Sequence, residues 1–376
     1  MIRFTWLQFR VQVTVALAAL VAFAVVLVVT GPHLASLYAS AITGCHGGTC
    51  ANAANTFLSR LTSASPYPIV YPVGIGLILA APAIIGMFWG APLIARELET
   101  RTFALAWTQS ITRARWLVVK LALTALAAMA VTEALSLMQA WWADPISKAV
   151  GVGGPYPAGS VFAQGRLSSF IFATSGITPL GYAAFGFALG TAAGALIRRT
   201  VPAMAVTLAI FAVVQVVMPL SVRPHLIPPD RTVLSGPSFF ESAGLSVGTL
   251  KASIVPGQPE AWILSSGAIN AAGRHVGAIP APCLSPSLGK GAPANVGACM
   301  ASRGIREAIT YQPANRYWPF QWIETGIFLA LALALAGVCF WQLGRRPRDR
   351  EASLPGMSAP ARAGKEVQSG AATVRP

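Results

Sequence analysis

The segment Gly90–Lys120 reads GAPLIARELETRTFALAWTQSITRARWLVVK and joins two long apolar runs. Its first half can be drawn as a helix with a wide apolar stripe, because hydrophobic residues recur at helical spacing and the charged residues fall on the other side. After a polar break, Thr112 is a candidate N-cap for a second helix. Arg113, Trp116 and Lys120 then share one face of that helix. Such a face can grip phosphate headgroups or a protein partner at a membrane surface.

The composition around this segment is that of a membrane protein. Of the 376 residues, 55% are hydrophobic and only 10% are charged, and the mean hydropathy is +0.61. These values are too apolar for an ordinary soluble domain. The net charge of +15 would suggest nucleic-acid binding in a soluble protein, but the basic residues lie along the boundaries of the apolar runs rather than on one folded face. We therefore expect a polytopic protein that contacts lipid and binds no nucleic acid.

Six apolar runs are long enough to cross a bilayer as helices, which takes about 20 residues each. The predicted fold class is an all-α polytopic membrane protein, with spans at about residues 11–30, 69–93, 117–142, 169–197, 201–220 and 322–343. Gly31 and Pro32 are expected to end the first span. Because that apolar run is longer than the core of a signal peptide, an uncleaved span is the preferred interpretation, with cleavage at Ala39–Ala41 as the alternative.

Three connecting regions are long enough to have their own roles. Residues 94–117 lie between spans two and three. Residues 221–321 are expected to form a loop domain of about 100 residues between spans five and six. Its expected elements are strands at 250–255 and 261–265 and a helix around 301–309. Residues 344–376 begin with a basic run and then lose all hydrophobic pattern, which predicts a disordered tail.

The distribution of Lys and Arg predicts the orientation. More than half of the 27 basic residues lie in segments 1–10, 94–120, 198–199 and 344–376, which make up less than half of the loop length. The positive-inside rule then places both termini and segment 94–117 in the cytosol and the 221–321 domain outside. The expected location is a plasma membrane.

Four of the five cysteines lie outside in this topology, where disulfides persist: Cys45, Cys50, Cys283 and Cys299. Three pairings are possible, and the favoured one joins the cysteines within each loop. A bond between Cys283 and Cys299 would close a loop of about 16 residues and contribute about 3 kcal/mol. A cramped metal site at Cys45, His46 and Cys50 is the alternative; no metal is expected.

The order of these parts resembles the membrane subunit of type 2 ABC transporters, the exporter-like permeases. The matching residues are Glu97, Thr102, Arg113, Trp116 and Lys120. The run Tyr311–Glu324 also looks like actinobacterial members of that group, whereas Arg101 stands where many relatives carry a glycine. A glycine there would allow a turn with positive φ, so the loop geometry is expected to differ in this chain.

The resemblance implies that segment 94–117 docks on a separate cytosolic ABC ATPase. The residues expected to couple the two subunits are Arg96, Glu97, Glu99, Arg101, Thr102, Arg113, Trp116 and Lys120, with Glu97 and Arg101 as direct contacts. It also implies a second permease copy, in a homodimer, and ATP-driven export. A plain positive-inside anchor, such as any membrane protein carries, is the alternative for this segment.

The chain has no chemistry of its own that would replace this partner. No G-x-x-x-x-G-K-[ST] loop occurs, so ATP must be bound elsewhere. The four histidines fall in outer segments without a neighbouring carboxylate or nucleophile motif, so we expect no enzymatic activity, no catalytic residue and no cofactor. The alternative function is a non-transporting membrane sensor or scaffold that uses the 221–321 domain and signals through the tail.

Polar residues and glycines inside the spans are the remaining candidates. Glu133 lies about 20 Å along span three from Lys120, inside the hydrocarbon layer, where an acid must face protein or water. With Gln139 it is a candidate for the substrate path; a structural hydrogen bond or snorkelling to the outer surface is the alternative. Small residues four apart let helices approach closely. We expect helix packing, or else a subunit contact, at Gly86, Gly90, Gly186, Gly190 and Gly194.

Overall fold

A computed structural model describes residues 2–46, 49–100, 113–153, 160–236, 255, 257–277, 280–284 and 296–352. Within these ranges, six helices are long and apolar enough to cross a membrane. They are Arg10–Ile42, Tyr67–Arg96, Val118–Trp142, Thr178–Ile197, Thr200–Leu226 and Ala314–Gln342. The prediction of a mostly helical protein with six spans is confirmed.

The helices of this part are α1 (Ile2–Ile42), α2 (Thr49–Ser63), α3 (Tyr67–Ile85), α4 (Ala91–Thr100), α6 (Arg113–Trp142), α7 (Asp144–Val152), α8 (Ser169–Ala173), α9 (Thr178–Ile197), α10 (Thr200–Val217), α11 (Arg223–Leu226), α13 (Ala281–Leu284), α14 (Val296–Ser302) and α15 (Tyr317–Ala352). Their linking turns include two π-helices, η1 (Gly86–Gly90) and η2 (Met218–Val222), and the 3₁₀ turn η3 (Ala314–Arg316). The strands are β1 (Asp230–Leu234), β2 (Trp262–Ile269) and β3 (Arg306–Gln312).

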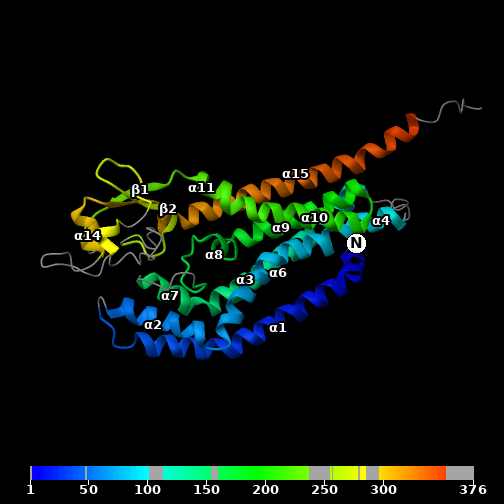
Figure 1. Cartoon of the computed structure of the whole chain (residues 1–376). Coiled ribbons are helices and arrows are strands. Elements are labelled where there is room, and N and C mark those ends of the chain that lie inside the picture. Colours follow the sequence, from blue (N-terminus) through cyan, green and yellow to red (C-terminus); the bar gives the residue numbers. More distant parts are fainter. Residues whose placement is uncertain are drawn as a thin grey trace, which may run out of the picture.

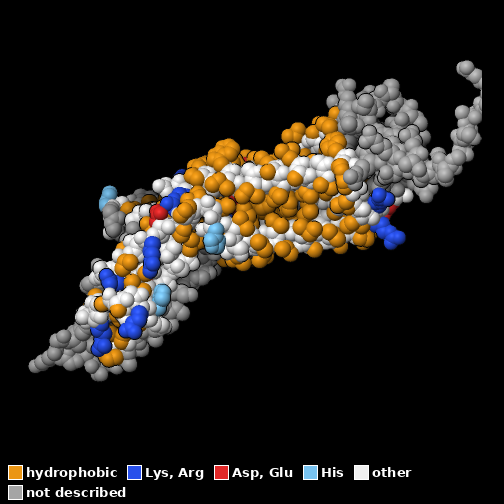
Figure 2. Space-filling view, turned by 90° about the horizontal axis from the view of Figure 1, so that it is seen from above, with side chains coloured by type: hydrophobic (Ala, Val, Ile, Leu, Met, Phe, Trp, Pro, Cys, Tyr) orange, Lys and Arg blue, Asp and Glu red, His pale blue; other side chains and the backbone are white. Residues whose placement is uncertain are grey.

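The long helices lie side by side, and the chain passes back and forth between two ends of the bundle (Figure 1). The N-terminus and α4 lie at one end, which we call the α4 end. The strands, α2, α7 and α14 lie at the other, which we call the sheet end. Figure 2 shows a band of exposed hydrophobic side chains around the middle, with Lys and Arg gathered at the two ends. This distribution is what a helix bundle needs in order to sit in a bilayer.

Helix α9 is the centre of the bundle. It packs against α3, η1, α4, α6, α10 and α15, and all but one of its residues from Thr178 to Ala195 are buried. The reason lies in its composition, because it has no charged residue between Thr178 and Ile197 and many of its residues are glycine or alanine. These small residues let neighbouring backbones approach closely, and the larger apolar side chains between them are buried against the other helices.

Several boundaries differ from those predicted. Helix α1 continues through Gly31 and Pro32 to Ile42; a proline inside a helix removes one backbone hydrogen bond, and flanking residues here keep the helix intact. The expected span 169–197 is broken into α8 and α9 by a turn in which Gly176 has φ 68°. Such a conformation suits glycine.

The helix that contains the sixth span is longer than the expected span at both ends. Helix α15 begins at Tyr317 and continues to Ala352, so residues 344–352 are helical where a disordered tail was predicted. Arginine and glutamate in this run are good helix formers, whereas Gly344 and Pro347 are poor ones. Residues 353–376 lie outside the described part of the chain.

The sheet corrects the all-α prediction. Its three strands are antiparallel in the order β1-β3-β2, with Ile309 of β3 opposite Thr232 of β1. The helix expected around 301–309 is wrong over most of its length: α14 ends at Ser302, Gly304 follows with φ 68°, and β3 begins at Arg306. The expected strand 261–265 lies within β2 except for Ala261, and most of the expected strand 250–255 lies outside the described residues.

Two disulfides brace the sheet end. Cys45 is bonded to Cys50 between α1 and α2, and Cys283 is bonded to Cys299 between α13 and α14. Each bond joins two cysteines of the same loop region, as predicted. The bond between Cys283 and Cys299 belongs to the small core that supports the sheet. Among the described residues, no cluster of three or more His, Cys, Asp or Glu side chains could hold a metal ion.

Candidate functional site

A glycine seam joins span two to span four. The seam consists of Gly86 and Gly90 in η1 and Gly186, Gly190 and Gly194 in α9. A Cβ atom on Gly190 would collide with the carbonyl oxygen of Gly86, and one on Gly86 would collide with that of Gly186. The two backbones are therefore in direct contact, which only glycine permits at these positions. The wider π-helical turn η1 occurs at the same place.

Span three presents a buried polar face to the bundle. Its members recur at helical spacing and are Lys120, Thr124, Thr132, Ser136 and Gln139. The two threonines donate to carbonyl oxygens of their own helix, whereas the Ser136 hydroxyl donates to the carbonyl oxygen of Thr174 at 2.8 Å. A polar face that runs the length of a membrane helix is costly unless it meets protein or water.

Glu133 and Gln139 lie on the half of α6 toward the sheet end. One carboxylate oxygen of Glu133 and both amide atoms of Gln139 are enclosed and have no hydrogen-bond partner in the described part of the chain. The amide of Gln139 fills the space beside Gly74 of α3, where a Cβ would overlap it. These groups have unused capacity to hydrogen-bond a molecule between the helices.

At the α4 end, Glu99 is tied to the start of span five. Its carboxylate accepts hydrogen bonds from the Thr200 backbone N–H at 2.9 Å and from the Thr200 hydroxyl at 2.7 Å. The Thr200 hydroxyl and amide, helped by the charge of Arg199, hold the pKa of Glu99 below its ordinary value. An acid at a helix N-terminus satisfies free backbone donors and interacts well with the helix dipole. Helix α4 is thereby attached to α10.

The other predicted coupling residues divide into two groups. Arg96 is exposed on α4, and Lys120 is buried at the start of the polar face of α6. Glu97, Arg113 and Trp116 belong to α4 and α6, but their side chains lie outside the described set; Arg101 and Thr102 lie outside it altogether.

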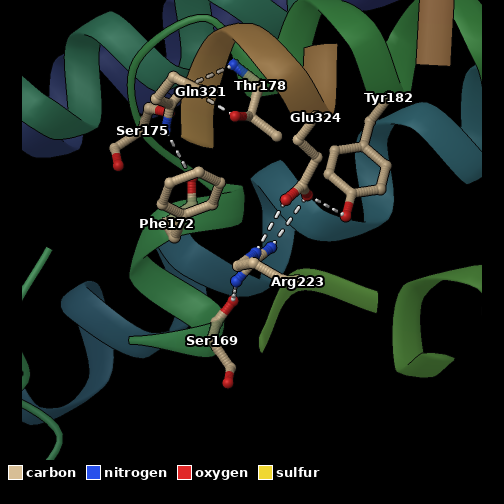
Figure 3. Close-up of polar contacts among 8 residues, drawn as sticks. All are labelled: Ser169, Phe172, Ser175, Thr178, Tyr182, Arg223, Gln321 and Glu324. Atoms are coloured by element: carbon tan, nitrogen blue, oxygen red, sulfur yellow. Dashed lines mark hydrogen bonds and ion pairs between the residues drawn. The ribbon is translucent and has the colours of Figure 1, made fainter. Parts of the chain in front are cut away.

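Toward the sheet end, Arg223 and Glu324 form an ion pair that the sequence analysis missed (Figure 3). The two nitrogens of Arg223 lie 2.8 and 3.0 Å from the two carboxylate oxygens of Glu324. Tyr182 donates its hydroxyl to the same carboxylate at 2.9 Å, and the guanidinium stacks 4.2 Å from the ring centre of Phe172. Both charged side chains are fully buried. The pair connects spans four, five and six.

Gln321, one turn before Glu324 on α15, holds the start of span four. Its side-chain oxygen accepts from the backbone N–H groups of Ile177 and Thr178 and from the Thr178 hydroxyl. Its amide donates to the carbonyl oxygens of Phe172 and Ser175, and Figure 3 shows Gln321 beside Phe172, Ser175 and Thr178. The sequence does contain a signal for this cluster. Arg223, Gln321 and Glu324 are polar residues at the edges of apolar runs, but their partners lie about a hundred or more residues away along the chain.

The family comparison covers most of this architecture. A family described as ABC-2 membrane transporter related matches residues 17–223, which is more than half of the chain. The matched range holds spans two to four and most of spans one and five, and it ends before the sheet and α15. Comparison with curated proteins and with solved structures gives no match. The family match does not favour the sensor or scaffold alternative.

Proposed function

The chain belongs to the ABC-2 membrane transporter related family and is a multi-pass membrane permease, and from this premise we propose that it exports its substrate with energy from a separate cytosolic ATPase. The ATPase docks on segment 94–117, with Glu97 and Arg101 as contacts. The chain itself performs no enzymatic step. Both termini and the α4 end face the cytosol of a bacterial cell, and the sheet domain faces outward.

The observation that carries this proposal is the link between Glu99 and Thr200. Both carboxylate oxygens of Glu99 are engaged by Thr200, so Glu99 acts as a transmitter rather than as a surface contact. A push on segment 94–117 moves α4, and Glu99 passes that displacement to the N-terminus of α10. Helix α4 also packs directly against α9 through the glycine seam, which gives the same push a second route into the bundle.

The displaced helix reaches across the membrane. Residues Thr200–Leu226 form one apolar helical span, and its far end carries Arg223, which is paired with Glu324 of α15. Span five therefore connects the ATPase side to the base of the sheet domain. Because buried ion pairs and packed helices move as units, a shift at Thr200 is transmitted rather than absorbed.

The substrate path follows the polar face of α6. Glu133 and Gln139 provide polar atoms that have no partner among the described residues, and the face extends from Lys120 at the α4 end. A second copy of the permease completes the path in a homodimer. Polar substrate groups meet hydrogen-bonding side chains there, at a depth where lipid supplies none.

The test is purification of the tagged chain from its native host in nanodiscs, followed by identification of any copurifying ATPase and measurement of its ATP turnover. We expect an ATPase to copurify with the parent chain, and Glu97→Ala with Arg101→Ala to remove it. Arg60→Ala, which removes one exposed basic side chain on α2 at the opposite end, is the control and should retain it. An ATPase that stays bound and fully stimulated without both contact residues would contradict the docking assignment.

A second set of variants separates coupling from the path. Glu99→Gln should keep the ATPase bound but lower substrate-stimulated turnover, because the charged cap on Thr200 is weakened. Glu133→Gln should change export without affecting ATPase binding, whereas Asp144→Asn, an exposed carboxylate of α7, should change neither. Unchanged export by Glu133→Gln with every substrate tried would remove Glu133 from the path.

A further inference from the structure

Two adjoining hollows at the sheet end form one groove. The first has a volume of about 340 Å³ and lies between the turn Gly257–Glu260 and the turn η3. The second, of about 140 Å³, continues past Arg166 to Trp318. Both are lined by Glu260, Ala314 and Asn315. We call this continuous space the Glu260 groove; it is separate from the polar face of α6 and from segment 94–117.

Hydrogen-bond acceptors are available along the Glu260 groove. The Glu260 side chain is 22% exposed, and its contact with the Arg166 guanidinium is 3.6 Å, which is longer than a hydrogen bond. The side-chain oxygen of Gln258 is enclosed and has no partner among the described residues. A partly buried carboxylate whose contact with its basic neighbour is this long favours a ligand that is positively charged and carries N–H donors.

The remaining walls are apolar and aromatic. Pro259 and Pro313 line the larger hollow, and Leu167, Tyr317 and Trp318 line the smaller one. The rings of Tyr317 and Trp318 meet edge to face with centroids 5.5 Å apart, and Trp318 is 56% exposed. Aromatic rings attract organic cations through their negative faces.

From these features we propose that the Glu260 groove binds a small organic cation, a primary ammonium group attached to an apolar or aromatic body. The ammonium group donates to the Glu260 carboxylate. The body of the ligand lies against the proline and aromatic walls, along the smaller hollow. The combined volume suits a compact ligand, since pockets for such molecules begin at about 300 Å³.

The test measures binding of 2-phenylethylammonium to the full-length chain in phosphatidylcholine nanodiscs, with empty nanodiscs as the blank. The neutral analogue 2-phenylethanol has nearly the same body and should not bind above the blank. Glu260→Gln should weaken binding of the ammonium probe about tenfold or more, because a charge-assisted contact is lost. Asp144→Asn removes the same charge at the same end outside the groove, and should bind like the parent. The experiment requires no ATPase, so its result is independent of the proposed export.

A second variant keeps the proposal testable if Glu260→Gln folds poorly. Asn315 is exposed and lines both hollows, so Asn315→Trp fills the groove without disturbing a buried contact. It should also weaken probe binding about tenfold or more, as the loss of both charge-assisted and apolar contacts requires. The proposal is overturned if the parent gives no saturable binding above the blank, if 2-phenylethanol binds equally well, or if Asn315→Trp binds like the parent.

Discussion

Arg223 and Glu324 form a two-pronged ion pair in which both side chains have no exposed surface. The pair joins the end of span five to the second turn of α15, and Tyr182 of α9 completes it. Removing two charges from water is expensive, and this geometry repays the cost through two short hydrogen bonds, a tyrosine hydroxyl and a stacked ring. The pair therefore links spans four, five and six at the end of the bundle that carries the sheet.

Breaking this pair should destabilise the protein strongly. Arg223→Ala or Glu324→Ala leaves the other charge buried and unpaired, which typically costs about 3–5 kcal/mol. Thermal unfolding of the purified chain in one detergent measures the loss. Arg166→Ala is the control, because its side chain is exposed and its ion pair with Glu260 is long, at 3.6 Å, and surface pairs contribute about 0–1 kcal/mol. Equal losses from the buried and the exposed arginine would contradict this assignment.

The glycine seam predicts a position-specific response to a single methyl group. Gly190→Ala places a Cβ against the backbone of Gly86, and overpacking of this kind costs about 1–3 kcal/mol. Gly337→Ala in α15 meets open space, so it should be neutral or slightly stabilising. Size-exclusion profiles after heating report the difference. If the two alanine variants have the same thermal midpoint, spans two and four are not in backbone contact.

The stability that the hydrogen bonds between Glu99 and Thr200 contribute should depend on pH. The hydrogen bonds from Thr200 lower the pKa of Glu99, so the stability from this link is fully present above the unfolded-state pKa of about 4.3 and is lost as the pH falls through the lower folded-state pKa. Hydrogen exchange of a peptide containing Thr200, compared between the parent and Glu99→Gln at each pH, measures it.

At neutral pH the parent peptide should exchange more slowly than the Glu99→Gln peptide. The difference should disappear once the carboxyl group of the parent is protonated in acid. Thr43→Val, which removes a hydroxyl bond to the last turn of α1 at the opposite end, should leave both curves unchanged. Equal exchange of the parent and Glu99→Gln at neutral pH would show that the cap does not hold α10.

The two disulfides should differ in how much they stabilise the folded protein. Cys283 and Cys299 are 16 residues apart and Cys45 and Cys50 only 5, and the stabilisation by a cross-link rises with the length of the loop, to about 3 kcal/mol near 15 residues. Cys283→Ser with Cys299→Ser should therefore increase the rate of proteolysis of the sheet domain. Cys45→Ser with Cys50→Ser should increase the rate of proteolysis at the α1–α2 turn by less. Non-reducing peptide mass spectrometry should find both bonds; free thiols at all four positions would refute the pairing.

The sequence by itself determined the membrane class, the six spans and their approximate positions. These follow from the local length and hydropathy of each run, because a bilayer imposes the same requirement on every crossing helix. The glycine spacing in spans two and four is also a local pattern. The ends were harder to predict: Pro32 lies inside α1, and the Arg-rich start of the tail continues α15.

Tertiary structure alone decided which residues meet. Arg223 and Glu324 are 101 residues apart, as are Glu99 and Thr200, and nothing in either local stretch specifies its partner. Strand β3 is a comparable case, since Arg306–Gln312 could be drawn as a helix until β1 and β2 supply its hydrogen bonds. The effect of hydropathy depends on the residues of one segment and on the solvent around it. Pairing depends on which segments packing brings close together.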